Sequence, residues 1–264
     1  MKTYIINLER SGERRKHILQ EAERCNLEYE LIKAVDGNKL SDSDYEKFCD
    51  MDEVRKYPGW LNSGAIGCSL SHYNVYKKII EDNVEMALVL EDDIILRDDL
   101  SEMLVRIKEN IRSNEIISLF YASFAPCQLS NQNVVSLSAD YDLHFPMDVN
   151  QPMMAAAYVI TKEAARTLSD VILPIRGAAD SWGYYYENKG FESFRCVYPV
   201  PLKVMGAKSD INYQSRHKFF TKIINDYKIP VFYQALRIAR LRKIKAWSEI
   251  QLVDKASPVA EIVR

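Results

Sequence analysis

The sequence lacks most of the features that mark specialised classes of protein. Its five cysteines are widely spaced and form no CxxC pair, so a disulfide framework is not expected and a reducing compartment is the default. No apolar run approaches the ~20 residues of a membrane-spanning helix. The N-terminus places an apolar stretch before its charged residues, the reverse of a secretory signal. These absences point to a cytosolic protein.

The chain also lacks an excess of either charge. Its 35 Lys and Arg residues oppose 37 Asp and Glu residues, which argues against a dedicated nucleic-acid-binding protein. Hydrophobic residues make up 47% of the sequence, enough to fill a sizeable core, so wholesale disorder is excluded. We find no internal repeat. A length of 264 residues therefore predicts one large domain, or one domain with an appendage.

A basic segment is hidden in this balance. From Arg216 to Lys245 the chain has nine Lys or Arg residues and one acid, so we divide it into a body, residues 1–215, and a basic tail, residues 216–264. Apolar and basic residues interleave over residues 231–247, which predicts an amphipathic helix attracted to anionic lipid. The alternative is a helix packed on the body or against a second subunit.

The body alternates apolar runs with helix-favouring segments. Strands are predicted at residues 4–8, 29–35, 86–90, 116–121 and 155–160. Helices are predicted at residues 11–25, 63–81, 101–112 and 161–168, with Asn62-Ser63 and Thr161 as helix starts. This alternation predicts an α/β fold with a mostly parallel central sheet.

The sharpest motif is the acidic triplet Glu91-Asp92-Asp93, which follows the apolar run 86–90 directly. Ligands of α/β folds gather beyond the carboxyl ends of strands, so these acids are candidate ligands of Mg²⁺ or Mn²⁺. Extended alternation would put Glu91 and Asp93 on one side and Asp92 on the other. The alternative is a solvated acidic loop.

Three further segments are candidate binding elements. Arginines after the first strand, in INLERSGERR, could hold phosphate, or could lie on an exposed helix face. In residues 63–81, Gly64 and Gly67 permit close approach of an anion, although His72 could be a packed side chain and Cys68 is most simply a core residue. Asp180 precedes the aromatic run 182–186, which could bind a sugar or could enter the core while Asp180 caps a helix.

In order and spacing, INLERSGERR, GAIGCSLSH, VLEDDI and AAAYVITKEAARTL resemble glycosyltransferase family 25, which includes bacterial lipooligosaccharide galactosyltransferases. The resemblance covers residues 1–212. It implies a GT-A-like nucleotide-sugar-binding fold, a UDP-sugar donor, a divalent metal (Mn²⁺ or Mg²⁺) and inverting transfer to an acceptor hydroxyl.

The resemblance also implies roles for single residues. Those that would bind the nucleotide or lie near the donor are Asn7, Leu8, Arg10, Arg15, Ser71 and His72. The metal-binding acids would be Glu91, Asp92 and Asp93. Asp180 takes the position of a later site aspartate and is the predicted general base, although Ala178-Ala179 replace the usual proline–valine before it.

The resulting prediction is an inverting glycosyltransferase that moves a sugar, most frequently galactose in this family, from a UDP-sugar to a lipooligosaccharide, lipopolysaccharide or related glycan acceptor. Its expected location is the cytoplasm, with peripheral attachment to the inner membrane through residues 216–247. One alternative is a nucleotidyltransferase, disfavoured because the N-terminal loop is not of GxGxR type. The other is a non-catalytic nucleotide-sugar-binding or scaffold protein, disfavoured by the intact acidic triplet.

Overall fold

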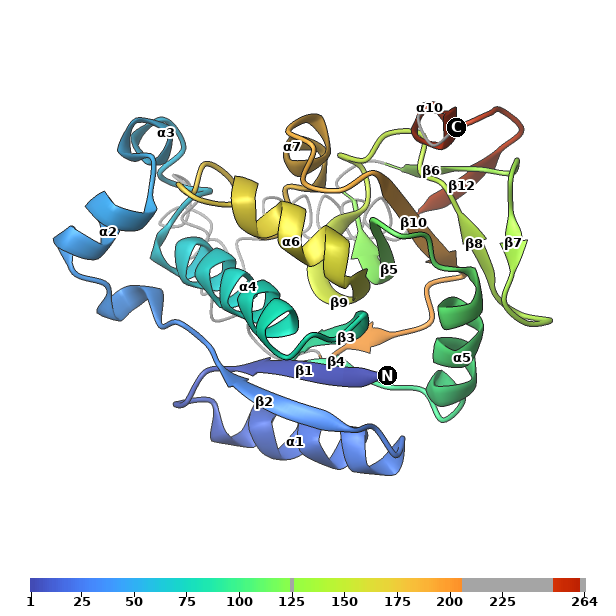
Figure 1. The fold of residues 1–264 in the computed structure, drawn as a ribbon, viewed down its shortest axis with the longest axis horizontal. Coiled ribbons are helices and arrows are strands. Elements are labelled where there is room, and N and C mark those ends of the chain that lie inside the picture. The colour runs from blue at the N-terminus through green and yellow to red at the C-terminus, as the bar shows by residue number, and fades with distance from the viewer. Residues whose placement is uncertain (124–125, 206–248, 262–264) are drawn as a thin grey trace, which may run out of the picture.

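The computed structural model describes residues 1–123, 126–205 and 249–261, and the structural statements below refer to these residues. Helices pack on both sides of a central eight-stranded sheet (Figure 1). In spatial order its strands are β2 (Tyr29–Lys33), β1 (Lys2–Asn7), β3 (Met86–Glu91), β9 (Met153–Thr161), β5 (Glu115–Ala122), β10 (Ser193–Tyr198), β8 (Asp142–His144) and β7 (Val135–Ser136).

The remaining elements surround this sheet. Two small sheets pair β4 (Ile94–Ile95) with β11 (Lys203–Val204) and β6 (Cys127–Ser130) with β12 (Ile250–Val253). The helices are α1 (Gly12–Arg24), η1 (Gly37–Lys39), α2 (Asp42–Phe48), α3 (Met51–Lys56), α4 (Ser63–Glu81), α5 (Leu100–Asn110), α6 (Lys162–Val171), α7 (Trp182–Glu187) and α10 (Pro258–Glu261). None of the helices in the described ranges has the length and apolarity needed to cross a membrane.

The α/β architecture is confirmed, but the direction of the strands is mixed. β1 runs parallel to β2 and β3, and β10 runs parallel to β5. β9 lies antiparallel between β3 and β5, and β8 is antiparallel to both β10 and β7. The expectation of a mostly parallel sheet therefore holds within β2-β1-β3 and β5-β10 and is wrong for the other pairs. The direction of β9 is set by long-range pairing, which local periodicity does not encode.

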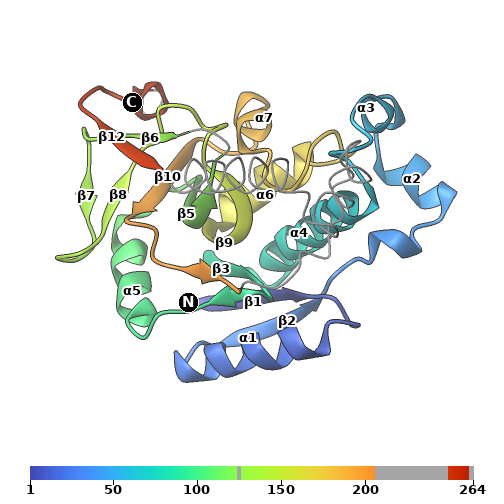
Figure 2. The ribbon, with the colours of Figure 1, turned by 180° about the vertical axis from the view of Figure 1, so that it is seen from behind.

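The sheet is buried on both faces, and β1 illustrates why. Successive side chains of a strand point to opposite faces. Tyr4 and Ile6 enter a core that includes residues of α4 and α6, whereas Ile5 packs with Ile18 and Ala22 of α1. Both ribbon views agree with this layering, with α1 on one side of β1 and α4 on the other (Figures 1 and 2).

The predicted helix starts at Asn62-Ser63 and Thr161 are confirmed. The Asn62 side chain accepts a hydrogen bond from the Ala65 N–H at the start of α4, and Thr161 does the same for the Ala164 N–H at the start of α6. Each cap satisfies a backbone donor that has no partner within the helix. α4 and α6 lie side by side in Figure 1, and the start of each helix is thus determined locally.

Two glycines allow α4 to contact the loop that follows β2. A Cβ atom at Gly67 would lie 2.6 Å from the Val35 carbonyl oxygen, and one at Gly37 would lie 1.7 Å from the Ser63 carbonyl oxygen. One turn after Gly67, the Ser71 hydroxyl accepts a hydrogen bond from the Val35 N–H at 2.8 Å. Because Gly37 and Gly67 have no side chains, the loop of residues 35–37 can pack directly against α4.

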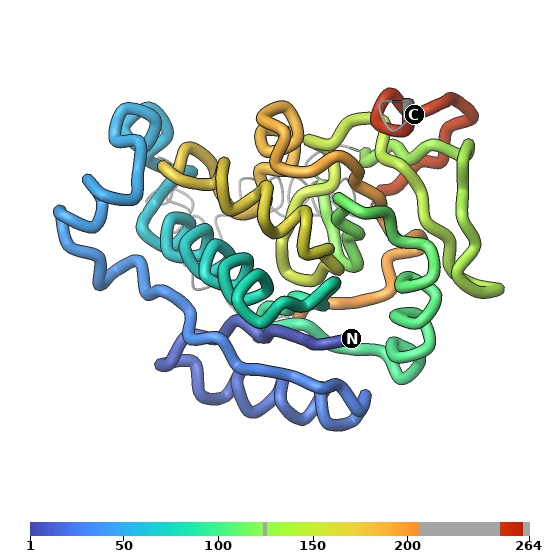
Figure 3. The backbone as a smooth tube through the Cα atoms, in the orientation of Figure 1, coloured from blue at the N-terminus to red at the C-terminus, as the bar shows by residue number. Residues whose placement is uncertain are grey.

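The last described segment returns to the body of the protein. Residues 250–253 form β12, which pairs in parallel with β6, and the two segments lie side by side in the tube view (Figure 3). The prediction of a helical tail over residues 216–264 is wrong at β12. The backbone of β12 is extended because it pairs with β6, which lies more than a hundred residues earlier in the chain. Residues 216–248, including the predicted amphipathic helix, lie outside the described residues.

We expect Gly67→Ala to destabilise the protein, because the new methyl group would collide with backbone atoms that cannot rotate away. Overpacking of this kind costs about 1–3 kcal/mol. Urea unfolding of the variant should show a correspondingly lower free energy of unfolding. Gly12→Ala is the matched control, since a Cβ there would meet nothing within 4 Å. Equal stability of the two variants would contradict the close-approach argument.

Candidate active site

A pocket opens where β1, β2 and β3 end beside the N-terminal half of α4. The carboxyl ends of these parallel strands meet at one edge of the sheet, the usual place for ligands in α/β folds. Its wall includes apolar groups of Leu8 and Val35. The charged residues that line it are Arg10, Arg14, Asp36, Glu91, Asp92 and Asp93. The pocket thus combines an apolar side with opposed cations and anions.

Asp92 is buried and is held by the first strand and helix. Asn7 donates from Nδ2 to Asp92 Oδ2 at 2.6 Å, and Arg14 Nη1 lies 3.3 Å from Asp92 Oδ1. Arg15 donates from Nε to Asn7 Oδ1 at 2.8 Å, which orients the amide so that its NH₂ group faces the carboxylate. Asn7 and Arg15, which the resemblance assigns to the nucleotide, here position Asp92.

Asp93 carries the least satisfied carboxylate of the triplet. Its Oδ1 is buried and has no hydrogen-bond partner among the described residues, and Arg14 Nη1 lies 3.8 Å from its Oδ2. Burial, together with the negative charges of Glu91 and Asp92, raises the pKa of Asp93 to about 7. Such a carboxylate has an oxygen available for a cation.

The three acids do not alternate as an extended strand would require. β3 ends at Glu91, and residues 92–93 form a turn, so the two-residue periodicity stops there. Arg14 lies near both Asp92 and Asp93, whereas Glu91 points toward α4. The expectation that Glu91 and Asp93 lie on one side and Asp92 on the other is therefore wrong.

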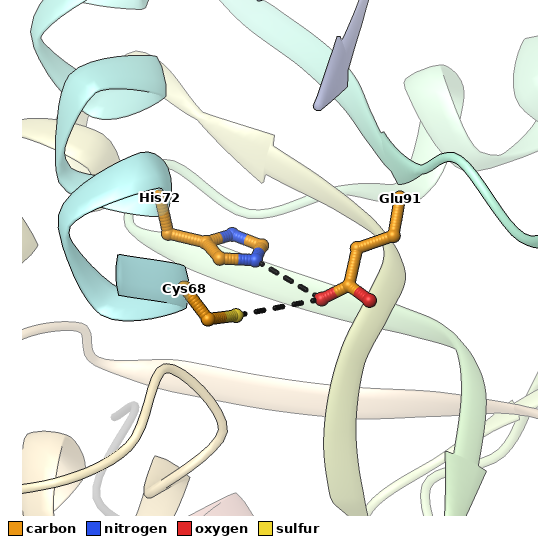
Figure 4. Close-up of side chains that lie close together, drawn as sticks. All are labelled: Cys68, His72 and Glu91. Atoms are coloured by element: carbon orange, nitrogen blue, oxygen red, sulfur yellow. Dashed lines mark hydrogen bonds and ion pairs between the residues drawn. The ribbon is translucent and has the colours of Figure 1, made fainter. Parts of the chain in front are cut away.

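Glu91 meets two side chains of α4 (Figure 4). Its Oε1 lies 3.4 Å from His72 Nε2 and 3.7 Å from Cys68 Sγ. His72 is fully buried, and its Nδ1 lies 2.8 Å from the Tyr158 hydroxyl. Cys68, expected to be a core residue, lies at the wall of the pocket. A role of His72 at the donor stays a prediction.

Asp180 lies on the loop before α7 and contacts the start of β9. Its Oδ2 accepts a hydrogen bond from the Met154 N–H at 3.0 Å, and the Trp182 Nε1–H donates to the Met154 carbonyl at 3.2 Å. These two bonds hold Met154 in the left-handed region, at φ 87°. Burial raises the pKa of Asp180, and the nearby charge of Glu91 adds to the effect. Asp180 is therefore electrostatically linked to the acidic triplet.

The aromatic run after Asp180 enters the core rather than the pocket. Trp182 and Tyr185 are each 1% exposed, and Trp182 packs against Tyr158 and Phe194. Asp180 does not cap α7, because its side chain bonds Met154 instead. Of the two alternatives for this segment, core packing is confirmed for Trp182 and Tyr185, and the capping role of Asp180 is wrong.

The other predicted binding residues occupy different positions. Leu8 and Arg10 line the pocket, and Arg10 forms an ion pair with Asp36. Ser71 also lines it, but its hydroxyl is bonded to the Val35 N–H and donates to the Gly67 carbonyl. The structure therefore leaves Leu8 and Arg10 as the direct candidates of the first loop and makes Ser71 a tether.

Two charged pocket residues are not among those to which the family resemblance assigns roles, although Arg14 is one of the arginines of INLERSGERR that could hold phosphate. Arg14 contacts both aspartates of the triplet, and Asp36 pairs with Arg10 across the pocket. Asp36 could have been found as an acid at the end of a strand, by the same reasoning that selects Glu91. Arg14 could not be distinguished from Arg15, because both lie on the same short helical segment and only packing decides which one faces the acids.

The model of glycosyltransferase family 25 (LPS biosynthesis protein) matches residues 1–182. The chain belongs to this family. The match includes all the pocket residues described above and ends just after Asp180. The family resemblance based on the four motifs is thereby confirmed.

Two relatives illustrate how family 25 proteins compare with this chain. Human procollagen galactosyltransferase 2 is 27% identical over 230 residues, which is 75% of this chain and 34% of the relative. A glycosyltransferase 25 family member of Anopheles gambiae is 42% identical over 99 residues, or 34% of this chain and 16% of the relative. The chain thus spans about a third or less of the length of these curated relatives.

Among solved structures, the crystal structure of A197 from STIV aligns with 82% of this chain and 99% of its own, at 8% identity and a TM-score of 0.36. A similarity of this size carries no argument about this protein. Membership of family 25 therefore rests on the sequence match.

The raised pKa of Asp93 predicts how its loss changes stability with pH. An acid with a higher pKa in the folded than in the unfolded chain favours folding at low pH, and this contribution is lost as pH rises from about 4 toward 7. Replacing Asp93 by Asn removes the buried charge. Asp93→Asn should therefore have a higher free energy of unfolding than the wild-type protein. This difference should be roughly 2 kcal/mol larger at about pH 8 than at about pH 5.

Urea unfolding at both pH values measures this difference. Asp52→Asn, which removes a carboxylate at an exposed position on α3, is the control. A parallel pH profile for Asp93→Asn and the wild-type protein would contradict the raised pKa of the Asp93 carboxyl.

Proposed function

We propose that this protein is an inverting glycosyltransferase that transfers galactose from UDP-galactose to a hydroxyl of a lipopolysaccharide-type glycan. The observation that carries the proposal is the family 25 match over residues 1–182, which contains the pocket and its acids. Relatives named procollagen galactosyltransferases support galactose as the sugar. The family description, an LPS biosynthesis protein, supports the acceptor class.

The acids of the pocket fit a hard divalent cation. Asp93 presents a buried carboxylate oxygen with no partner in the described part of the chain, and its raised pKa reflects burial and repulsion that a cation would relieve. Carboxylate oxygens are the ligands that Mg²⁺ and Mn²⁺ prefer. Asp93 would therefore hold the metal, with Asp92 beside it. When bound, the metal supplies charge neutralisation for a departing diphosphate.

The remaining pocket residues match the parts of a UDP-sugar. Leu8 and Val35 offer an apolar wall for the base, and Asp36 can accept hydrogen bonds from ribose hydroxyls. Arg10 and Arg14 bring positive charge to the same pocket, where guanidinium groups suit diphosphate oxygens. Arg10 pairs with Asp36 and Arg14 with Asp92, all of which line the pocket, so both guanidinium groups are held there.

Asp180 is our candidate general base. Inverting transfer is a single displacement in which the acceptor hydroxyl loses its proton as it attacks, and a carboxylate near that oxygen accepts it. Burial raises the pKa of Asp180, which makes its carboxylate a stronger proton acceptor. The Met154 N–H fixes one of its oxygens, which leaves Oδ1 for the acceptor.

The direct test is UDP release from a panel of UDP-sugars, with and without Mn²⁺ and a truncated lipooligosaccharide acceptor. We expect release from UDP-galactose that requires both additions, and a product whose mass increases by one hexose. Asp93→Ala is the matched variant, and it should lose the UDP release that depends on Mn²⁺. Release of pyrophosphate from a nucleoside triphosphate and a sugar phosphate would instead favour the nucleotidyltransferase alternative.

Asp180→Asn should retain UDP-sugar binding and lose most turnover. The amide oxygen of asparagine can still accept the Met154 N–H, so the loop should keep its shape, whereas an amide cannot take the acceptor proton. General-base catalysis contributes about 10²–10⁴-fold, which sets the expected loss of kcat. Calorimetry and steady-state kinetics measure the two properties. An unchanged kcat would remove Asp180 from the mechanism.

We also propose that the protein is cytoplasmic and attaches to anionic membrane through residues 216–247, as their interleaved basic and apolar residues predict. Truncating the tail would remove β12, which pairs with β6, so charge substitution in the full chain is the better test. Neutralising three tail arginines should reduce flotation with anionic liposomes. These are Arg237, Arg240 and Arg242, each replaced by Gln.

A matched control variant neutralises three exposed arginines of the body, Arg55, Arg106 and Arg166. Because basic residues near a membrane contribute about 1 kcal/mol each, the tail variant should bind far more weakly than this control. Equal flotation of the two variants would show that the tail does not carry membrane attachment.

A further inference from the structure

Cys68, His72 and Glu91 form a cluster of three different donor atoms. Cys68 and His72 lie four residues apart on α4 and so share one face of the helix, and Glu91 ends the neighbouring strand β3 (Figure 4). Their sulfur, nitrogen and oxygen atoms all lie within 4.8 Å of one another. Among the described residues, this is the group of His, Cys and acid side chains whose ligand atoms converge in this way.

The hydrogen bonds of His72 indicate the tautomer of its neutral ring, in which Nε2, the nitrogen that faces Glu91, carries no proton. Tyr158 donates its hydroxyl hydrogen to the Tyr76 oxygen at 3.2 Å, so its own oxygen can accept from His72 Nδ1–H at 2.8 Å. In the neutral ring, Nε2 then presents a lone pair. That lone pair faces an acceptor, the Glu91 carboxylate, so the arrangement calls for a positive charge between them.

The distances distinguish a metal ion from a proton. A charge-assisted N–H···O bond is usually about 2.7–2.9 Å long, whereas His72 Nε2 and Glu91 Oε1 are 3.4 Å apart. Around tetrahedral zinc, the usual bond lengths put nitrogen about 3.4 Å and sulfur about 3.6 Å from a carboxylate oxygen. The corresponding distances here are 3.4 and 3.7 Å. Both distances to Glu91 thus match those of ligands around one ion, and the sulfur and nitrogen atoms lie within 4.8 Å of each other.

We propose that Cys68 Sγ, His72 Nε2 and Glu91 Oε1 bind a Zn²⁺-like transition-metal ion. A thiolate, an imidazole and a single carboxylate favour zinc over the hard cations that all-oxygen sites prefer. The Cys68 thiol loses its proton to the solvent when the ion binds. The Tyr158 hydroxyl acts as the outer partner that orients a metal-bound histidine. This site is separate from Asp93 and does not depend on the proposed transferase activity.

Such an ion would join α4 to β3 at the wall of the pocket. Three protein ligands leave a fourth position, and Cys68 and Glu91 both line the pocket, so that position would face it. The ion would also neutralise Glu91, one of the charges that raise the pKa of Asp93. Within the acidic triplet, Glu91 would thus bind the Zn²⁺-like ion, whereas Asp93 would bind the hard divalent cation.

Cobalt titration of the full-length, chelator-treated protein tests the proposal, because Co²⁺ reports thiolate ligation through a near-ultraviolet charge-transfer band. We expect one equivalent of Co²⁺ to produce the band and Zn²⁺, but not Mn²⁺, to abolish it. Cys68→Ser should lose the band, whereas Cys49→Ser, which removes a buried cysteine of another cluster, should keep it. Asp93→Asn should keep it as well.

Two further variants keep the test decisive if Cys68→Ser fails to fold. Glu91→Gln retains the thiol and the side-chain shape and should bind Co²⁺ at least tenfold more weakly. Tyr158→Phe removes only the hydroxyl that orients His72, and outer partners of this kind are worth about 10–100-fold in affinity. The proposal is overturned if no band appears in the wild-type protein, or if folded variants at Cys68, Glu91 and Tyr158 all bind like wild type.

Discussion

The repulsion among three adjacent carboxylates at the end of β3 is the constraint around which the rest of the site is arranged. Buried like charges are costly unless each acquires a compensating partner. β1 supplies Asn7 to Asp92 and α1 supplies Arg14 to both aspartates, whereas Glu91, which is 32% exposed, meets His72 and Cys68 of α4. Two elements beside β3 thus provide partners for the aspartates, and one oxygen of Asp93 has no hydrogen-bond partner among the described residues.

The chemistry of the site follows from this division. Asp92 is held by hydrogen bonds, one oxygen of Asp93 has no hydrogen-bond partner among the described residues, and Glu91 converges with a thiol and an imidazole. Three neighbouring carboxylates therefore have three different surroundings. Asp180 comes from the loop before α7, and it bonds the backbone of Met154, which has a conformation that few residues adopt.

Sequence reasoning selected acids and arginines that the fold brings to one pocket, but it did not predict how their side chains are arranged. The acids after β3 and the arginines after β1 do meet in one pocket, because parallel strands bring their carboxyl ends together. Which side chains face the ligand was not predictable. Arg14 lines the pocket whereas Arg15 bonds Asn7, a difference of one helical position, and Trp182 is buried because its ring packs against Tyr158 and Phe194.

The sequence alone determined the positions of α4 and α6 and the placement of acids after β3, because caps and apolar periodicity act between near neighbours. Only the tertiary structure decided that β9 runs antiparallel, that β12 joins β6, and that Glu91 faces Cys68 and His72. These arrangements join segments far apart along the chain. Their free energies depend on which surfaces the whole fold brings into contact, and no local pattern records that.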